Sequence, residues 1–213
     1  MRYIYFFTKQ IVVIFVFTMG LGAIEVNIKE GVPYVDVDIN GANIKIERIQ
    51  DVNHKLKNSY TKTSRAAPPF SIQPYQPVDG IETISELDVI EFIKNDISEN
   101  DGLMIDARMQ RWHVEGTIPG AMNIPFTMFS SDSTNSKIEE IFKLFGGTKE
   151  DIHWNFNKSK RLIIFDNGPW CQQGVRAMKH LVSLGFPKSK IRYYRGGMQY
   201  WQILGLTTHI PES

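Results

Sequence analysis

Apolar and polar positions follow four different patterns along the chain, and each pattern predicts a different structure. Residues 11–17 are an uninterrupted apolar run, and residues 32–49 alternate between apolar and polar. Residues 50–78 are mostly polar and then rich in proline. The rest of the chain switches between short apolar runs and helical periodicity. We therefore expect a leading segment, an extension and one α/β domain.

The leading segment, residues 1–23, has the pattern of a signal peptide. Arg2 and Lys9 make its start positive, the apolar run follows, and small side chains at 20–23 suit signal peptidase. An uncleaved membrane anchor is the alternative, but the 14 residues 11–24 are short for about 30 Å of hydrocarbon. We expect export to the periplasm and no membrane contact after cleavage.

The extension, residues 24–78, has two predicted parts. In 32–49, Asn40-Gly41 is a two-residue turn signal between alternating apolar positions, which predicts a β-hairpin. Two strands alone are marginally stable, so this hairpin must dock on other structure. For residues 50–78 we expect an extended connector that packs across the domain, with a disordered linker as the alternative. Its predicted anchors are Phe70, Ile72 and Tyr75.

The domain, residues 79–213, alternates predicted strands with predicted helices. Strands are expected over 81–84, 103–105, 162–165 and 191–194, and helices over about 86–93, 136–145, 174–184 and 197–201. Ser85 and Asp88 form a capping box before the first helix, which includes Leu87 in its apolar stripe. Such alternation predicts a parallel sheet with helices on both faces.

Cys171 is the one cysteine, so no intrachain disulfide can form. It lies six residues after the apolar run ends at Phe165 and just before a helix, where open parallel sheets bind ligands. Backbone N–H groups and the helix dipole predict a lowered pKa for its thiol. Gly174 would let the backbone curve tightly, and Arg176 would hold an anionic substrate. A buried cysteine without a role is the alternative.

Composition limits the classes of partner. The formal net charge is +1, and it becomes −1 when the two basic residues of the leading segment are removed. This near-neutral balance gives no electrostatic case for binding nucleic acid. The apolar share of 42% and charged share of 22% are ordinary for a globular protein. We expect no cofactor and no metal.

Four segments resemble the rhodanese family, in the order that the family has, over about residues 81–207. They are Asp106-Ala107-Arg108, the run Gly116 to Pro125, Cys171 to Arg176, and Leu184-Gly185-Phe186 with Tyr194 to Met198 and Trp201. The resemblance implies a rhodanese-like domain with a central parallel five-stranded sheet flanked by helices on both faces. Further segments, three before this stretch and two in its later part, are similar to a group of exported bacterial rhodanese-like proteins: Thr61 to Arg65, Pro68-Pro69-Phe70, Gln73-Pro74, Asn167 to Trp170 and Gly205 to Thr208.

The resemblance implies a sulfurtransferase. Cys171 would take sulfane sulfur from a small anion such as thiosulfate, hold it as a persulfide, and pass it to a thiol, cyanide or a partner protein. Arg176 would orient the donor, and the loop residues between them would bind substrate: Gln172, Gln173, Gly174 and Val175. Arg108 is a further candidate for substrate binding, although pairing with a carboxylate such as Asp106 is the expected role.

The sequence departs from the family pattern at several positions. Thr117 stands where the signature usually has histidine. Ala67 and Ser71 stand where the exported group has cysteines, and Asp166 occupies a position that is often cysteine. Cys171 therefore has no resolving partner in its own chain. Neutral Gln172 and Gln173 also differ from the positive loops of rhodaneses that prefer thiosulfate.

Three other functions stay open. A phosphatase or arsenate reductase places five residues between Cys and Arg, whereas this chain has four. A non-catalytic binding module and a sulfur carrier for another exported protein are the others. Beside the loop, Arg111 and His113 either rim the pocket or lie on a solvated surface. Trp170 either shields the persulfide or packs, and packing is the role expected for Tyr193 and Trp201.

Overall fold

The structure is a computed structural model that describes residues 25–66, 70–129 and 136–212. The predicted signal peptide lies outside these residues. The elements are β1 (Tyr34–Ile39), β2 (Ala42–Glu47), η1 (Ser59–Thr61), β3 (Glu82–Ile84), α1 (Glu86–Phe92), η2 (Ile93–Ile97), β4 (Gly102–Asp106), α2 (Gln110–His113), β5 (Ala121–Asn123), η3 (Phe126–Phe129), α3 (Ser136–Leu144), β6 (Thr148–Glu150), β7 (His153–Asn155), β8 (Arg161–Phe165), α4 (Gln173–Ser183), η4 (Lys188–Lys190), β9 (Ile191–Tyr194) and α5 (Gly197–Ile203).

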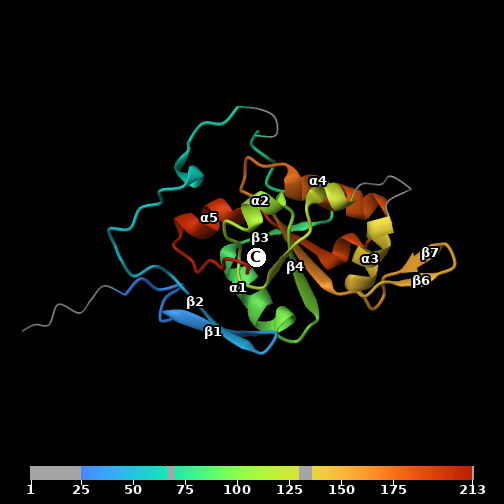
Figure 1. The fold of residues 1–213 in the computed structure, drawn as a ribbon, viewed down its shortest axis with the longest axis horizontal. Coiled ribbons are helices and arrows are strands. Elements are labelled where there is room, and N and C mark those ends of the chain that lie inside the picture. The colour runs from blue at the N-terminus through green and yellow to red at the C-terminus, as the bar shows by residue number, and fades with distance from the viewer. Residues whose placement is uncertain (1–24, 67–69, 130–135, 213) are drawn as a thin grey trace, which may run out of the picture.

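A parallel five-stranded sheet with the order β3-β9-β8-β4-β5 forms the centre of the domain (Figure 1). The predicted fold class is therefore confirmed. The four strands expected from apolar runs are present within a residue of their predicted bounds. The fifth strand, β5, has a mixed polar sequence without a strand pattern and falls in the family signature.

Helices cover both faces of this sheet, and the central strand β8 shows why its sequence is continuously apolar. Leu162 and Ile164 point into a core shared with α3 and α4. Ile163 and Phe165 point into a second core shared with α1 and α5. A strand buried on both faces has no position left for a polar side chain.

The predicted hairpin is confirmed as β1 and β2, which pair antiparallel around Asn40-Gly41. Both turn residues have positive φ, 54° and 82°, as a two-residue turn of this kind requires. Val37 and Ile46 are buried in the second core. The hairpin is also tied to the end of the chain, because Glu47 accepts a hydrogen bond from the Thr207 backbone N–H (3.0 Å) and Ile49 donates one to Gly205 (2.7 Å).

The connector after the hairpin does pack across the domain, past α5 (Figure 1). Two of its three predicted anchors are wrong, because Ile72 is 85% and Tyr75 is 72% exposed. Phe70 is half-buried against the Trp170 ring. The main chain supplies the attachment instead: Gln73 donates from its N–H to Pro169 (2.8 Å) and accepts from the Arg195 guanidinium (2.7 Å). Proline-rich backbone cannot pair in a sheet, so isolated contacts of this kind hold it.

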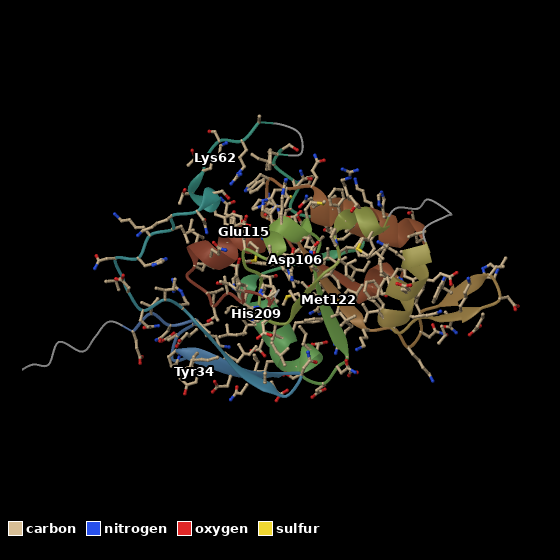
Figure 2. The ribbon with its side chains drawn as sticks, viewed as in Figure 1. Tyr34, Lys62, Asp106, Glu115, Met122 and His209 are labelled. Carbon is tan, nitrogen blue, oxygen red and sulfur yellow. The ribbon has the colours of Figure 1, made fainter. Side chains whose placement is uncertain are left out.

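Smaller elements were missed or misjudged from sequence. The hairpin of β6 and β7 projects beside α3, away from the main sheet (Figure 1). Leu87, expected inside, is 44% exposed, although the Ser85–Asp88 capping box forms as predicted. Among the described residues, none of the helices has the length and apolar character needed to cross a bilayer. Figure 2 shows Tyr34 on the outer hairpin and Asp106 near the middle of the molecule.

Candidate active site

Two neighbouring strands, β4 and β8, bring the chemistry together at the carboxyl edge of the sheet. Asp106 at the end of β4 lies in register with Phe165 at the end of β8. Arg108 follows β4 by two residues, and the loop from Asp166 to Cys171 follows β8. This is the edge at which open parallel sheets bind ligands, and the loop that carries Cys171 lies there.

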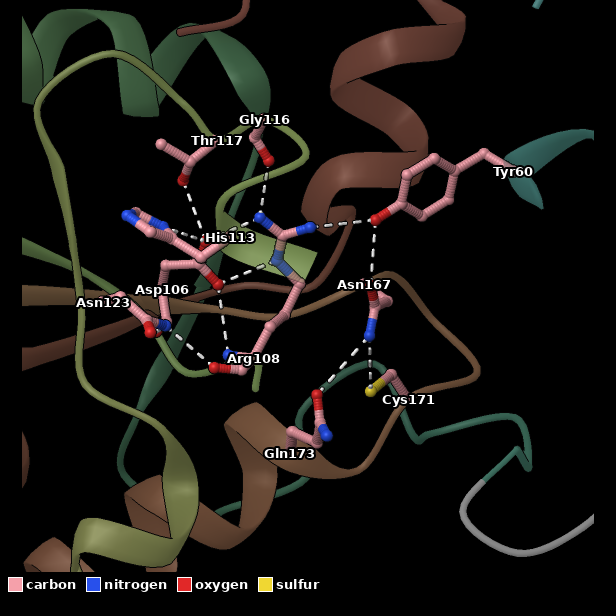
Figure 3. A network of polar contacts seen from close by, with 10 residues as sticks. All are labelled: Tyr60, Asp106, Arg108, His113, Gly116, Thr117, Asn123, Asn167, Cys171 and Gln173. Atoms are coloured by element: carbon pink, nitrogen blue, oxygen red, sulfur yellow. Dashed lines mark hydrogen bonds and ion pairs between the residues drawn. The ribbon is translucent and has the colours of Figure 1, made fainter. Parts of the chain in front are cut away.

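Arg108 is buried, and each of its guanidinium nitrogens donates to a protein group (Figure 3). Its Nε (2.8 Å) and Nη2 (2.6 Å) bind Asp106, which confirms the expected pairing. Nη2 also donates to the Gly116 carbonyl (2.7 Å), and Nη1 donates to the Tyr60 hydroxyl (3.1 Å). The Arg108 guanidinium is therefore linked to the loop that carries Cys171 through the Tyr60 hydroxyl.

Asp106 is completely buried and fully partnered. Its carboxylate also contacts His113 Nδ1 (3.0 Å) and accepts from the Thr117 hydroxyl (2.9 Å). Burial alone would raise the pKa of Asp106, but hydrogen bonds from His113, Arg108 and Thr117 together hold it below its usual value. His113 is thus part of the scaffold rather than a pocket rim or a solvated residue. Arg111 is exposed beside its neighbour Trp112.

Cys171 lies just before α4 with its sulfur buried, 1% exposed. The Asn167 side-chain amide donates to its Sγ at 3.6 Å. Burial, followed by the charge of Asp166, raises the pKa of the Cys171 thiol to about 12. Hydrogen bonding from the backbone N–H groups of Gln173 and Asn167 acts in the opposite direction and is outweighed. The predicted lowering of this pKa is therefore wrong for this arrangement, in which the sulfur is shielded from water beside a carboxyl group.

Asp166 is a second buried carboxyl group that the sequence analysis treated only as a position often held by cysteine. It accepts from the backbone N–H groups of Gly168 (3.1 Å) and Gly174 (2.8 Å). None of its partners among the described residues is a cation. Burial raises the pKa of Asp166 to about 7. Its place directly after a buried strand was the signal that could have identified it.

The predicted substrate-binding residues of the loop take different positions. Gln172 donates to the Ser71 hydroxyl (3.0 Å), and Gln173 is buried and accepts from Asn167 (3.4 Å). Val175 lies in the core. Arg176 is exposed, with its guanidinium 4.8 Å from the centre of the Phe126 ring. The structure thus brings Gln173 close to Cys171 and places Arg176 on the outer surface of α4.

Gly174 serves a different purpose from the one expected. The predicted loop of six residues is shorter, because α4 begins at Gln173, and Gly174 has an ordinary helical backbone without positive φ. A Cβ atom here would lie 3.2 Å from both the Asp166 carboxylate and the Tyr193 ring. Gly174 therefore provides space for Asp166 rather than conformational freedom.

Besides Asp166, the sequence analysis missed Tyr60 as a residue of the site, and it did not assign a role to Asn167. The Tyr60 hydroxyl donates to Asn167 Oδ1 at 2.9 Å (Figure 3). Burial raises the pKa of Tyr60 to about 12, although Arg108 opposes this. No local pattern marks Tyr60, because it lies in the connector. Asn167 was quoted only as part of a motif.

Trp170 packs against the connector. The Arg65 guanidinium lies 3.9 Å from its ring centre, and its indole N–H donates to Gln199 (2.7 Å). A cavity of about 640 Å³ opens beside it, lined by Trp170, Lys62 and Arg65 among others but not by Cys171. Tyr193 and Trp201 are completely buried, as expected. In the described part of the chain, no three His, Cys, Asp or Glu side chains gather where a metal ion would bind.

Comparison with known proteins identifies one family. A model of the Rhodanese-like domain matches residues 90–204, which is more than half of the chain. No curated protein matches in sequence.

The fold is similar to that of a human single-domain sulfurtransferase, with 22% identity, 57% of this chain and 95% of that chain covered, and a TM-score of 0.40. It is also similar to a thiosulfate sulfurtransferase from Pseudomonas aeruginosa (13% identity, 65% and 22% covered, TM-score 0.46). A third similar structure is a protein of unknown function from Rhodopseudomonas palustris, described as a possible tyrosine phosphatase. It has 23% identity, 61% of this chain and 85% of that chain are covered, and the TM-score is 0.42.

Proposed function

The chain belongs to the rhodanese-like domain family, and we propose that it is a sulfurtransferase with Cys171 as its nucleophile. The position of Cys171 carries this proposal. It lies at the carboxyl edge of the central strand, immediately before a helix, with an amide N–H of Asn167 directed at its sulfur. Donors around a sulfur atom stabilise the negative charge that both a thiolate and a persulfide bear.

The reaction proceeds in two transfers. The Cys171 thiolate attacks the outer sulfur of a donor such as thiosulfate, a new S–S bond forms, and sulfite leaves with the electrons of the broken S–S bond. A thiolate or cyanide acceptor then attacks the outer persulfide sulfur, and Cys171 leaves as the thiolate. The Asn167 amide and the Gln173 backbone N–H support that leaving group. Arg176, exposed on α4, attracts the anionic donor to this side of the domain.

The test is a mass measurement on the purified protein after incubation with a panel of sulfane donors: thiosulfate, polysulfide and an organic persulfide. We expect an increase of about 32 Da, one sulfur atom, that a reducing thiol removes. Because Cys171 is the single cysteine, Cys171→Ser must abolish the adduct while its circular dichroism spectrum stays that of the wild type. An unmodified protein with every donor would contradict the proposal.

One observation favours a non-catalytic binding module as a second candidate. A buried thiol with a pKa of about 12 is almost entirely protonated at neutral pH, so few molecules hold the nucleophile. If no donor modifies Cys171 although a small alkylating reagent reaches it, the binding module is the better reading.

The phosphatase alternative has less support from the site. A phosphate group carries about two negative charges, and it would meet the Asp166 carboxyl group, which already occupies the Gly174 N–H. Hydrolysis of an aryl phosphate by the same samples would revive this alternative.

Export is a separate proposal that rests on the sequence pattern. We infer cleavage after residue 22 or 23 and a periplasmic protein made of the extension 24–78 and the domain 79–213. The N-terminal residue of the protein recovered from cells tests it.

A further inference from the structure

A chain of hydrogen bonds runs from the buried Arg108 to the sulfur of Cys171 (Figure 3). Arg108 Nη1 donates to the Tyr60 hydroxyl at 3.1 Å, and that hydroxyl donates to Asn167 Oδ1 at 2.9 Å. The Asn167 amide then donates to Cys171 Sγ at 3.6 Å and to Gln173 Oε1 at 3.4 Å. Tyr60 comes from the extension, 107 residues before Asn167 and outside the matched range 90–204.

The direction of this chain follows from its first member. A guanidinium can only donate, so the Tyr60 oxygen is the acceptor from Arg108 and its hydrogen is free to point elsewhere. Among the described residues, the Asn167 amide oxygen is the acceptor to which that hydrogen is donated. With its oxygen held by Tyr60, Asn167 must turn its NH₂ group toward Cys171. The opposite orientation would aim two donors at the Tyr60 oxygen and leave its hydrogen without a partner.

We propose that Tyr60 is a positioning residue, which fixes the Asn167 amide so that an N–H faces the Cys171 sulfur. The sulfur is thereby an acceptor in this network, and a donor facing it favours the thiolate over the thiol. The extension is then part of the active site and not only a covering segment. The catalytic meaning of this role rests on the proposed function, whereas its effect on the thiolate does not.

The contacts that hold Tyr60 support a defined position. Its backbone N–H donates to the Asn58 side chain (3.1 Å), and its carbonyl accepts from Gln199 on α5 (3.2 Å). Asn58 in turn donates to Gln202, also on α5 (2.6 Å). Tyr60 is therefore fastened to α5 through its own carbonyl and through Asn58, and only 9% of it is exposed.

Other titratable groups face Cys171 and act on it independently. Asp166, from the β8–α4 loop, disfavours the thiolate. Tyr193, from β9, interacts with Cys171 and also lies beside Asp166. The test must therefore compare variants in which these two groups are unchanged.

The decisive variant is Tyr60→Phe, which keeps the ring and removes the hydroxyl. We expect the thiolate fraction of Cys171 below its pKa to fall about tenfold, equal to a rise of one pKa unit. Two readouts report the thiolate fraction below that pKa without any sulfur donor: the pH dependence of the ¹³Cβ resonance of the single labelled cysteine between pH 8 and 11, and the rate of alkylation by iodoacetamide at pH 8–10. The control is Tyr194→Phe, which also removes a hydrogen bond of a buried tyrosine, to Glu86 on α1 (2.8 Å), and should leave both readouts unchanged.

A second variant, Asn167→Leu, tests whether Tyr60 acts through Asn167. We expect a similar fall, and the double variant should lose no more than Asn167→Leu alone, because the two residues act in series. Additive losses would show that Tyr60 acts by another route and would overturn the proposal.

An unchanged Cys171 titration in a folded Tyr60→Phe protein would also overturn it, and Tyr60 would then be a packing residue. Because neither readout needs a sulfane donor, the outcomes separate the two proposals. If no donor gives the wild type an adduct of about 32 Da, but the Cys171 titration shifts in Tyr60→Phe, only the proposed function is overturned. If the wild type forms the adduct, but the Cys171 titration does not shift in Tyr60→Phe, only the role of Tyr60 is overturned.

Discussion

The two carboxyl groups at the carboxyl edge of the sheet, Asp106 and Asp166, differ in almost everything except their position. Asp106 ends β4 and Asp166 follows β8, the parallel neighbour of β4, and both are completely buried. Asp106 is paired with Arg108 and its pKa lies below the usual value. Asp166 accepts from two backbone N–H groups, has no cationic partner within residues 25–66, 70–129 and 136–212, and its pKa is raised to about 7.

The difference shows how one sheet edge serves two purposes. Around Asp106 the Arg108 guanidinium and the His113 and Thr117 side chains all bind the carboxylate, so the charge of this half is neutralised. Around Asp166 the charge is uncompensated, and the nearby Tyr193 hydroxyl has no hydrogen-bond partner among the described residues. Polar groups left without partners are costly, and they occur where a protein holds a reactive group. Tyr60 and Asn167 connect the two halves.

The largest expected effect comes from breaking the paired half. Arg108→Leu leaves Asp106 buried without its cation, which should lower the free energy of unfolding by about 3–5 kcal/mol. The control is Arg192→Leu, since Arg192 pairs with Glu82 on the surface (3.1 Å) and its loss should cost under about 1 kcal/mol. Urea denaturation followed by circular dichroism measures both. Equal losses would mean that the buried pair contributes no more than a surface pair.

Removing the charge of the Asp166 carboxylate should raise the free energy of unfolding, whereas Arg108→Leu lowers it. In the unfolded chain Asp166 releases its proton near 3.8, and in the folded protein near 7. Between these values the folded state binds the extra proton, so this group makes stability fall as pH rises from about 4 to about 7. Each pKa unit is about 1.4 kcal/mol, so the charged carboxylate costs about 4 kcal/mol above pH 7.

Asp166→Asn should therefore remove the fall in stability with rising pH. At pH 8 we expect a gain of about 2 kcal/mol rather than the full 4 or so, because one backbone N–H loses its acceptor in the variant. The matched variant Asp106→Asn should be destabilised at pH 8. The stability from Asp106, whose pKa is lowered, is present above about pH 4 and lost below it. Urea unfolding at pH 5, 6, 7 and 8 checks the slope from Asp166, and the measurement at pH 8 checks the loss at Asp106. Parallel pH profiles of Asp166→Asn and the wild type would refute the assignment.

The smallest effect compares two neighbours on β9. In the described part of the chain the buried Tyr193 hydroxyl has no hydrogen-bond partner, whereas the Tyr194 hydroxyl donates to Glu86. Tyr193→Phe should be neutral or stabilising by about 1 kcal/mol, and Tyr194→Phe should be destabilising by about 1 kcal/mol. Thermal unfolding of the two variants side by side is sufficient. A loss at Tyr193 equal to that at Tyr194 would show that its hydroxyl does have a partner.

Much of the scaffold could be predicted, because its signals are local. The continuous apolar run of β8, the Asn40-Gly41 turn and the Ser85–Asp88 capping box each identified an element from a few adjacent residues. The pairing of Arg108 with Asp106 was also expected, since the two lie two residues apart after a strand. The position of Cys171 followed from the general rule for parallel sheets.

The rest depends on contacts between distant segments. Tyr60 reaches Asn167 only because the connector folds back over α5, and no spacing along the chain shows this. The predicted pKa of Cys171 failed for the same reason: a helix dipole is visible in sequence, but burial and the charge of Asp166 are not. The short strands β5 to β7 carry too few apolar residues to be distinguished from loops.

The hydrogen bonds between residues 47–49 and 205–207 join segments that the ribosome makes far apart in time. The hairpin is among the first described parts to be made, yet it pairs with nearly the last. At about 5–20 residues per second, the ribosome needs about 10–30 s to make the chain between them. The hairpin therefore waits while the domain behind it is produced. Cys171 and its neighbours are made before the extension that completes them can dock.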